Sequence, residues 1–99
     1  ELTDTTMAPY YPKGCYVVID QRSPLQDQDD VLFFNHTVQR LQFRSYLTDG
    51  QHAILKCKQP GFPIYQQTSE DLMIGRCILA QVRTISTLAS VDNTVLESI

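Results

Sequence analysis

Arg40-Leu-Gln-Phe-Arg-Ser-Tyr46 is the stretch with the clearest periodicity in the chain. Apolar Leu41 and Phe43 alternate with polar residues, so the segment would bury one face as a strand. Thr48-Asp49-Gly50 follows closely, and glycine tolerates the positive φ that a tight hairpin turn needs. We therefore predict a hairpin whose returning strand covers His52–Cys57.

Strand-like segments also lie on both sides of this hairpin. They are rich in β-branched and aromatic residues, and we predict strands over Cys15–Asp20, Val31–Phe34 and Met73–Arg83. Gly75 indicates a bulge or a close backbone approach in the last of them. Two prolines exclude a central strand over Gln59–Pro63. Because no helical pattern of convincing length precedes residue 84, the sequence predicts an all-β fold, a small strongly twisted sheet or a partly open barrel.

The length of 99 residues suits one domain, which we place at residues 1–83. Residues 84–99 form a Thr- and Ser-rich tail, for which a strand extension, a short helix and disorder all remain open. The chain begins at Glu1 without a start methionine, so we expect it to be a fragment or a processed product.

Charge argues against direct nucleic-acid binding by this segment. The formal net charge is −3, and the eight lysines and arginines are scattered, whereas a DNA-binding domain usually has a basic face. We assign the aromatic residues to the core, although a nucleic-acid-binding barrel that stacks bases on them is a second alternative. No apolar run has the length of a transmembrane helix and no signal peptide is visible, so we expect a cytoplasmic protein that makes no membrane contact.

Residues that bind metals or cofactors occur without the required spacing. Asp27, Asp29 and Asp30 lack the glycine-pinned loop of a calcium site, so we predict a solvated loop there. His36 and His52 have no cysteine at zinc spacing, and no glycine-rich phosphate loop is present. The three cysteines share no Cys-x-x-Cys spacing, which favours free thiols. We therefore expect no metal and no cofactor.

Five short blocks follow one another in a characteristic order over residues 4–83. They are Thr6-Met7-Ala8-Pro9 with the turn Pro12-Lys13-Gly14, then Leu41-Gln-Phe-Arg44-Ser-Tyr, the hairpin at Asp49-Gly50, Leu55-Lys-Cys-Lys-Gln-Pro-Gly-Phe-Pro63, and Ile74-Gly75-Arg76-Cys-Ile-Leu-Ala. This ordered set resembles the carboxy-terminal domain of LexA-like and phage-type repressors, a signal-peptidase-like family that cleaves itself with a serine–lysine dyad. No single block is specific; the order of the set carries the resemblance.

The resemblance also locates the positions of that dyad. In the family, a serine hydroxyl attacks a peptide bond of its own chain, and a lysine kept neutral by burial takes the proton. The serine position is Thr6 here, or less well Thr5, and the lysine position is Arg44. A guanidinium stays protonated, so Arg44 cannot act as the base. We therefore expect no catalytic residue and regard the chain as an inactive relative, a pseudo-peptidase. The other candidate bases, all predicted to be solvated, are Lys13, Lys56, Lys58, His36 and His52.

The resemblance implies that this domain oligomerises a prophage-type transcriptional repressor, as a homodimer or a higher assembly. Operator DNA would be bound only by a helix-turn-helix domain upstream of this chain, and an antirepressor protein would be the regulating partner. The expected dimer interface is the closing strand, with Met73, Ile74, Arg76, Ile78, Ala80 and Val82. The first alternative is an active self-cleaving peptidase with Thr6 as nucleophile.

Overall fold

The computed structural model describes residues 1–81 and 95–97, and these contain strands and no helix. The strands are β1 Tyr16–Asp20, β2 Asp30–Asn35, β3 Arg40–Thr48, β4 Ala53–Lys56, β5 Tyr65–Gln66, β6 Leu72–Gln81 and β7 Val95–Glu97. The predicted all-β fold is therefore confirmed. None of the described residues belongs to a helix with the length and apolar character to cross a bilayer.

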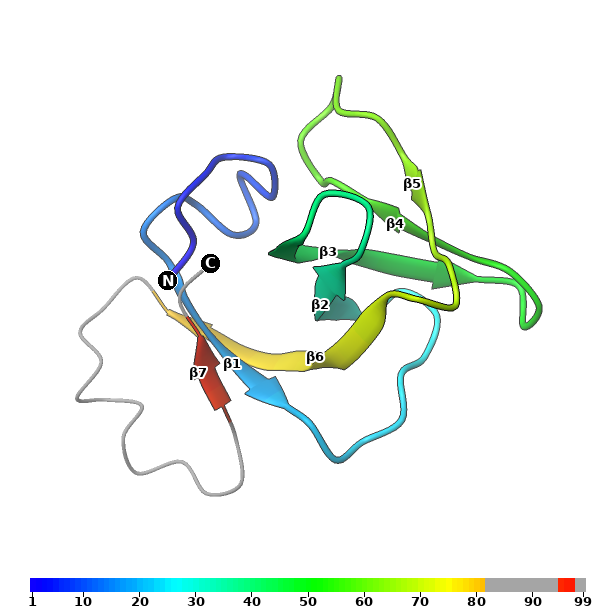
Figure 1. Cartoon of the computed structure of the whole chain (residues 1–99). Coiled ribbons are helices and arrows are strands. Elements are labelled where there is room, and N and C mark those ends of the chain that lie inside the picture. The colour runs from blue at the N-terminus through cyan, green and yellow to red at the C-terminus, as the bar shows by residue number, and fades with distance from the viewer. Residues whose placement is uncertain (82–94, 98–99) are drawn as a thin grey trace.

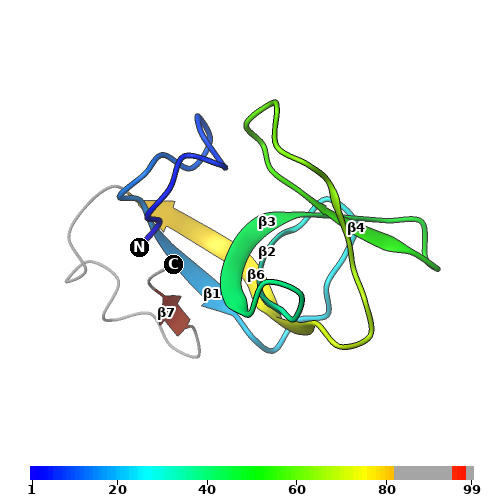
Figure 2. The same cartoon turned by 45° about the horizontal axis from the view of Figure 1, so that its top comes forward.

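The strands form one antiparallel sheet in the order β5-β4-β3-β2-β6-β1-β7. Figures 1 and 2 show that the sheet is strongly twisted and does not close into a barrel. The predicted hairpin joins β3 to β4, with Ser45 opposite Lys56 and Thr48 opposite Ala53. Gly50 in its turn has a φ of 96°, a left-handed conformation that glycine adopts without strain because it has no Cβ atom.

The predicted strands match the observed ones with shifts of a residue or two at their ends. β5 was not predicted, and β7 lies within the tail at residues 84–99, pairing with β1. Residues 82–94 and 98–99, including the predicted strand end at 82–83, lie outside the described part of the chain.

Strand β2 is buried on both faces of the sheet. Val31, Leu32 and Phe33 are all 0% exposed, and alternate side chains of a strand point to opposite faces. One face carries the buried cluster Leu2, Met7, Cys15, Val17, Ile19, Leu32 and Phe43, and the other carries Val31, Phe33 and Leu55. The N-terminal segment, residues 1–15, contributes Leu2 and Met7 to the first cluster, and it is the blue coil beside the sheet in Figure 1.

Gly75 lies where β6 passes close to Ile19 and Asp20 at the end of β1. On β6 there is one extra residue, because Leu32 pairs with Gly75 while Phe33 pairs with Met73, and this confirms the predicted bulge. A Cβ atom at Gly75 would lie 2.7 Å from Cγ2 of Ile19 and closer still to the carbonyl oxygen of Asp20. Only glycine therefore fits this crossing without a backbone shift.

Replacing Gly75 with alanine should lower the free energy of unfolding by about 2–4 kcal/mol, because the new methyl group overlaps the β1 backbone. Gly50→Ala is the matched control: no heavy atom lies within 4 Å of the point that a Cβ would occupy there, so only the left-handed φ opposes it, at about 1–2 kcal/mol. Urea unfolding of both variants measures the difference. An equal loss in the two variants would contradict the close approach at Gly75.

Candidate functional site

The two ends of the N-terminal segment are joined to each other by backbone hydrogen bonds. Leu2 N donates to Cys15 O at 2.8 Å, and Gly14 N donates to Leu2 O at 2.7 Å. Near its middle, Gln59 N donates to Thr6 O at 2.8 Å, which ties the segment to the loop after β4. Met7 is 1% exposed in the core, so its neighbour Thr6 has a fixed position above the sheet.

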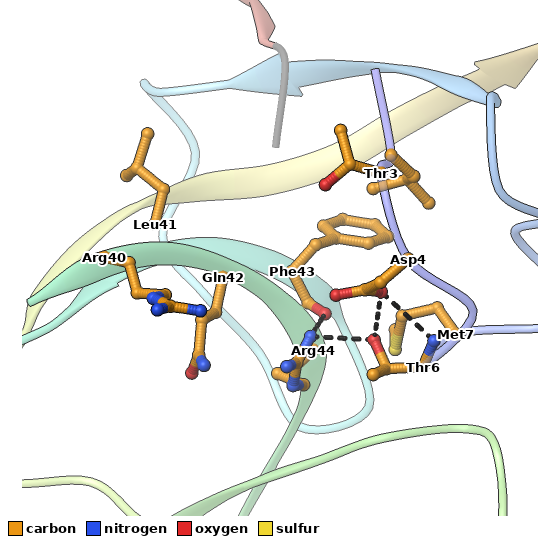
Figure 3. Close-up of a pocket in the computed structure, with 10 residues that line it drawn as sticks. Thr3, Asp4, Thr6, Met7, Arg40, Leu41, Gln42, Phe43 and Arg44 are labelled. Carbon is orange, nitrogen blue, oxygen red and sulfur yellow. Dashed lines mark hydrogen bonds between the residues drawn. The ribbon is translucent and has the colours of Figure 1, made fainter. Parts of the chain in front are cut away.

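The two residues that the resemblance assigns to the dyad positions are in direct contact. Arg44 Nη1 on β3 donates a hydrogen bond to Thr6 Oγ1 at 3.0 Å, although the residues are 38 positions apart. The Thr6 hydroxyl donates to Asp4 Oδ1 at 2.7 Å, and Thr6 N donates to the same oxygen at 3.1 Å. Figure 3 shows this chain of contacts from Asp4 through Thr6 to Arg44. Thr6 is only 7% exposed, so its hydroxyl has little access to water.

This arrangement does not support base-assisted attack by Thr6. Arg44 Nη1 also donates to its neighbour's carbonyl, Phe43 O, at 2.7 Å, so the guanidinium acts as a donor in both contacts. A permanently protonated group cannot accept the hydroxyl proton. Asp4 accepts the hydrogen bond from the Thr6 hydroxyl, and Asp4 is exposed to solvent. A hydrated carboxylate is a weak base for an alkyl hydroxyl.

The other candidate bases are engaged elsewhere or lie in solvent. Lys58 Nζ lies 3.1 Å from Asp30 Oδ1 and 5.2 Å from the ring centroid of Tyr10. His36 Nε2 lies 2.8 Å from Glu70 Oε2 on the surface. The three remaining candidate bases are exposed to solvent: Lys13, Lys56 and His52. Within the described residues, none of these five side chains hydrogen-bonds to Thr6.

A pocket of about 360 Å³ opens beside the Thr6–Arg44 contact. One wall is the N-terminal segment and the other is the first half of β3; the lining residues are Leu2, Thr3, Asp4, Thr6, Met7 and Arg40–Arg44. Phe43 belongs to the buried cluster and Leu41 packs against it, whereas Arg40, Gln42 and Arg44 point to the opposite side of the strand (Figure 3). The pocket is therefore bordered by apolar side chains on one side of β3 and by two cationic side chains and an amide on the other.

Asp30 has a structural role that the sequence did not reveal, since it was predicted to be a solvated loop residue. That prediction is wrong, because Asp30 begins β2 and is partly buried. Its carboxylate accepts from Tyr11 Oη at 2.6 Å, from Ser45 Oγ at 2.8 Å and from Lys58 Nζ at 3.1 Å. Burial, and then this hydrogen bond to Asp30, raise the pKa of Tyr11 far above its usual range. The signal available was its position directly before the apolar run Val31–Phe34, which makes it a strand residue.

The cysteines carry no reactive thiol at this pocket. Cys15 and Cys57 are buried and Cys77 is partly buried. Burial raises the pKa of the Cys77 thiol to about 11, so it stays protonated at neutral pH. No group of three or more His, Cys, Asp or Glu side chains within residues 1–81 is placed to hold a metal ion.

The residues expected at the dimer interface fall in three different environments. Met73 packs against the cluster with Phe33, and Ile74 packs against the opposite cluster. Arg76 Nη1 is 3.9 Å from Asp29 Oδ1, and its Nε is buried without a hydrogen-bond partner among the residues that the structure describes. Ile78, which is 46% exposed, and Ala80 lie on the surface. Val82 lies outside the described residues.

Removing the Thr6 hydroxyl should leave Asp4 and Arg44 without the group that bridges them. We expect Thr6→Val to lower the free energy of unfolding by about 1–2 kcal/mol, while Thr6→Ser, which keeps the hydroxyl, stays within about 1 kcal/mol of the parent. Thr5→Val is the control, since Thr5 is exposed. Urea unfolding measures all three; a Thr6→Val value equal to that of Thr5→Val would show that the bridge contributes nothing.

Comparison with known proteins assigns this site to no family. No protein-family model matches the chain, and no curated protein matches it. Function is therefore inferred from the contacts described above and from the ordered motifs of the sequence.

Proposed function

We propose that this chain is the oligomerisation domain of a phage-type transcriptional repressor and that it has lost the self-cleaving activity of the family it resembles. The observation that carries the proposal is the 3.0 Å hydrogen bond from Arg44 Nη1 to Thr6 Oγ1. It joins the two positions that the sequence motifs assign to the nucleophile and the base, and it places a permanent cation where the base would have to be neutral.

The exposed end of β6 supports assembly through this domain. Ile78 is 46% exposed and Leu79 is 37% exposed, and Ala80 beside them is also exposed. Strand β6 pairs with β2 from Leu72 to Arg76 and with β1 from Arg76 to Gln81, so in the described part of the chain its exposed end has a partner strand on one side only. A second copy would contact the apolar side chains of this end across a two-fold axis. Burying exposed apolar side chains is the ordinary driving force for such association.

Dimerisation would act on DNA binding through geometry. A single helix-turn-helix domain contacts one half-site weakly. Holding two such domains together makes the second contact intramolecular, which raises apparent affinity by about 100-fold or more. In this proposal the operator is bound only by the helix-turn-helix domains, and this domain supplies the two-fold symmetry that a palindromic operator matches.

Regulation would then differ from that of a self-cleaving repressor. With Arg44 in the base position, cleavage is not available as the induction step, so a protein partner such as an antirepressor would disrupt the assembly. A cytoplasmic location follows from this proposed function.

The first prediction from this proposal concerns the assembly state. Sedimentation equilibrium of the chain should give a reversible dimer or a larger even-numbered assembly, and Ile78→Asp should raise the dissociation constant by about 30-fold or more because a charge replaces a buried apolar contact. Val38→Asp is the control, since Val38 is 48% exposed but lies in the turn between β2 and β3. A strict monomer at high micromolar concentration would remove oligomerisation as the role of this domain.

The second prediction concerns cleavage. We expect the full-length protein to remain intact at pH 10, where a lysine base would be substantially deprotonated and an arginine base would not. Mass spectrometry after prolonged incubation detects any fragment. The contrary result is a fragment cut upstream of Thr6 that disappears in the Thr6→Ala variant, which would establish the peptidase alternative.

A further inference from the structure

Three hydrogen-bond donors line the pocket from one side of β3. They are the side chains of Arg40, Gln42 and Arg44, which occupy alternate positions and point the same way (Figure 3). Gln42 Oε1 accepts from Asn35 Nδ2 at 3.0 Å, which leaves the amide NH₂ group of Gln42 as its remaining polar function. These three side chains therefore bring N–H donors to the pocket from this strand.

Arg44 keeps a whole edge of its guanidinium available. Both of its hydrogen bonds leave from Nη1, one to Thr6 Oγ1 and one to Phe43 O. These contacts orient the group. Within residues 1–81, Nε and Nη2 make no hydrogen bond, and they are the pair of donors that a carboxylate accepts side-on with two parallel hydrogen bonds. The side chain is thus held in place before a ligand arrives, which reduces the entropy lost on binding.

The charge of the pocket is not neutralised within the described part of the chain. Neither Arg40 nor Arg44 has a carboxylate oxygen at ion-pair distance there, although other cations of the protein do. Asp4 is the one acidic residue among the lining residues, and it is bonded to Thr6. Two guanidinium groups against one carboxylate give the pocket a net charge of +1, in a chain whose formal net charge is −3. A local positive site in an acidic protein concentrates anions.

We propose that this pocket binds a carboxylate, with Arg44 as the side-on anchor, the Gln42 amide as a second donor and Arg40 as the flanking charge. The net charge of +1 matches a monoanionic carboxylate better than a doubly charged phosphate. The carboxylate belongs either to a free small molecule or to the end of a polypeptide chain, and the two sources share this chemistry.

This inference does not require that the domain dimerise. Ligand binding depends on residues of the pocket, and assembly was proposed for other residues, those at the exposed end of β6. Both this inference and the proposed loss of cleavage depend on the charge of Arg44. Ligand binding and cleavage are measured in separate experiments, so one can fail without the other.

The test is an NMR titration of the whole ¹⁵N-labelled chain with benzoate, at constant ionic strength. Benzamide, which has the same shape without the charge, is the matched control ligand. We expect saturable shifts at the backbone amides of residues 40–44 with benzoate and none with benzamide. Inorganic phosphate should bind more weakly than benzoate. The same titration with N-acetyl-glycyl-alanine and with its terminal amide identifies the source: tighter binding of the peptide acid than of benzoate assigns a chain end, and the reverse order assigns a free small molecule.

Variants locate the site and keep the test decisive. Arg44→Gln should weaken benzoate binding by about tenfold or more, because a charge-assisted pair of hydrogen bonds is lost. Arg40→Gln, at an exposed position where folding is not at risk, should weaken it by about threefold. Arg22→Gln is the control, because it removes the same charge from an arginine outside the pocket. Unchanged affinity in Arg40→Gln and in folded Arg44→Gln, equal shifts with benzamide, or an equal loss in Arg22→Gln would each overturn the proposal.

Discussion

The position of the candidate site depends on one partly buried carboxylate, that of Asp30. It binds Tyr11 of the N-terminal segment, Ser45 of β3 and Lys58 of the loop after β4. These are the same three parts of the chain that meet around Thr6, since β3 carries Arg44 and the loop carries Gln59. A partly buried ion is costly unless its lone pairs are satisfied, and three donors to one carboxylate meet that requirement. The edge-on packing of Tyr11 against Phe43, with ring centroids 4.9 Å apart, reinforces the same junction.

Local patterns in the sequence were sufficient to predict most of the sheet. Alternation over residues 40–47 and the glycine at position 50 predicted the β3–β4 hairpin, and Gly75 predicted the bulge in β6. Strand β5 was missed because its two residues are too few to show a period. Such patterns report on neighbours within a few residues, and they carry no information on which strands lie side by side.

The site was predicted only in part, for the same reason. The order of the motifs singled out Thr6 and Arg44, but that they touch is a consequence of the fold, which brings positions 38 residues apart to 3.0 Å. Asp30 was misread because its partners Tyr11 and Ser45 stand 19 and 15 positions away in the chain. Met73 and Ile74 were both predicted at one interface, yet as neighbours on a strand they pack on opposite faces.

The two strands at the ends of the sheet are short, and this limits how copies of the protein can aggregate when oligomerisation brings them together. Fibrils grow when exposed edge strands accept further strands, and long flat edges are the hazard. Here the terminal strands β5 and β7 have two and three residues, so an incoming chain finds only a few backbone groups to bond at either end. An assembly of this domain would therefore have little tendency to polymerise through these two end strands.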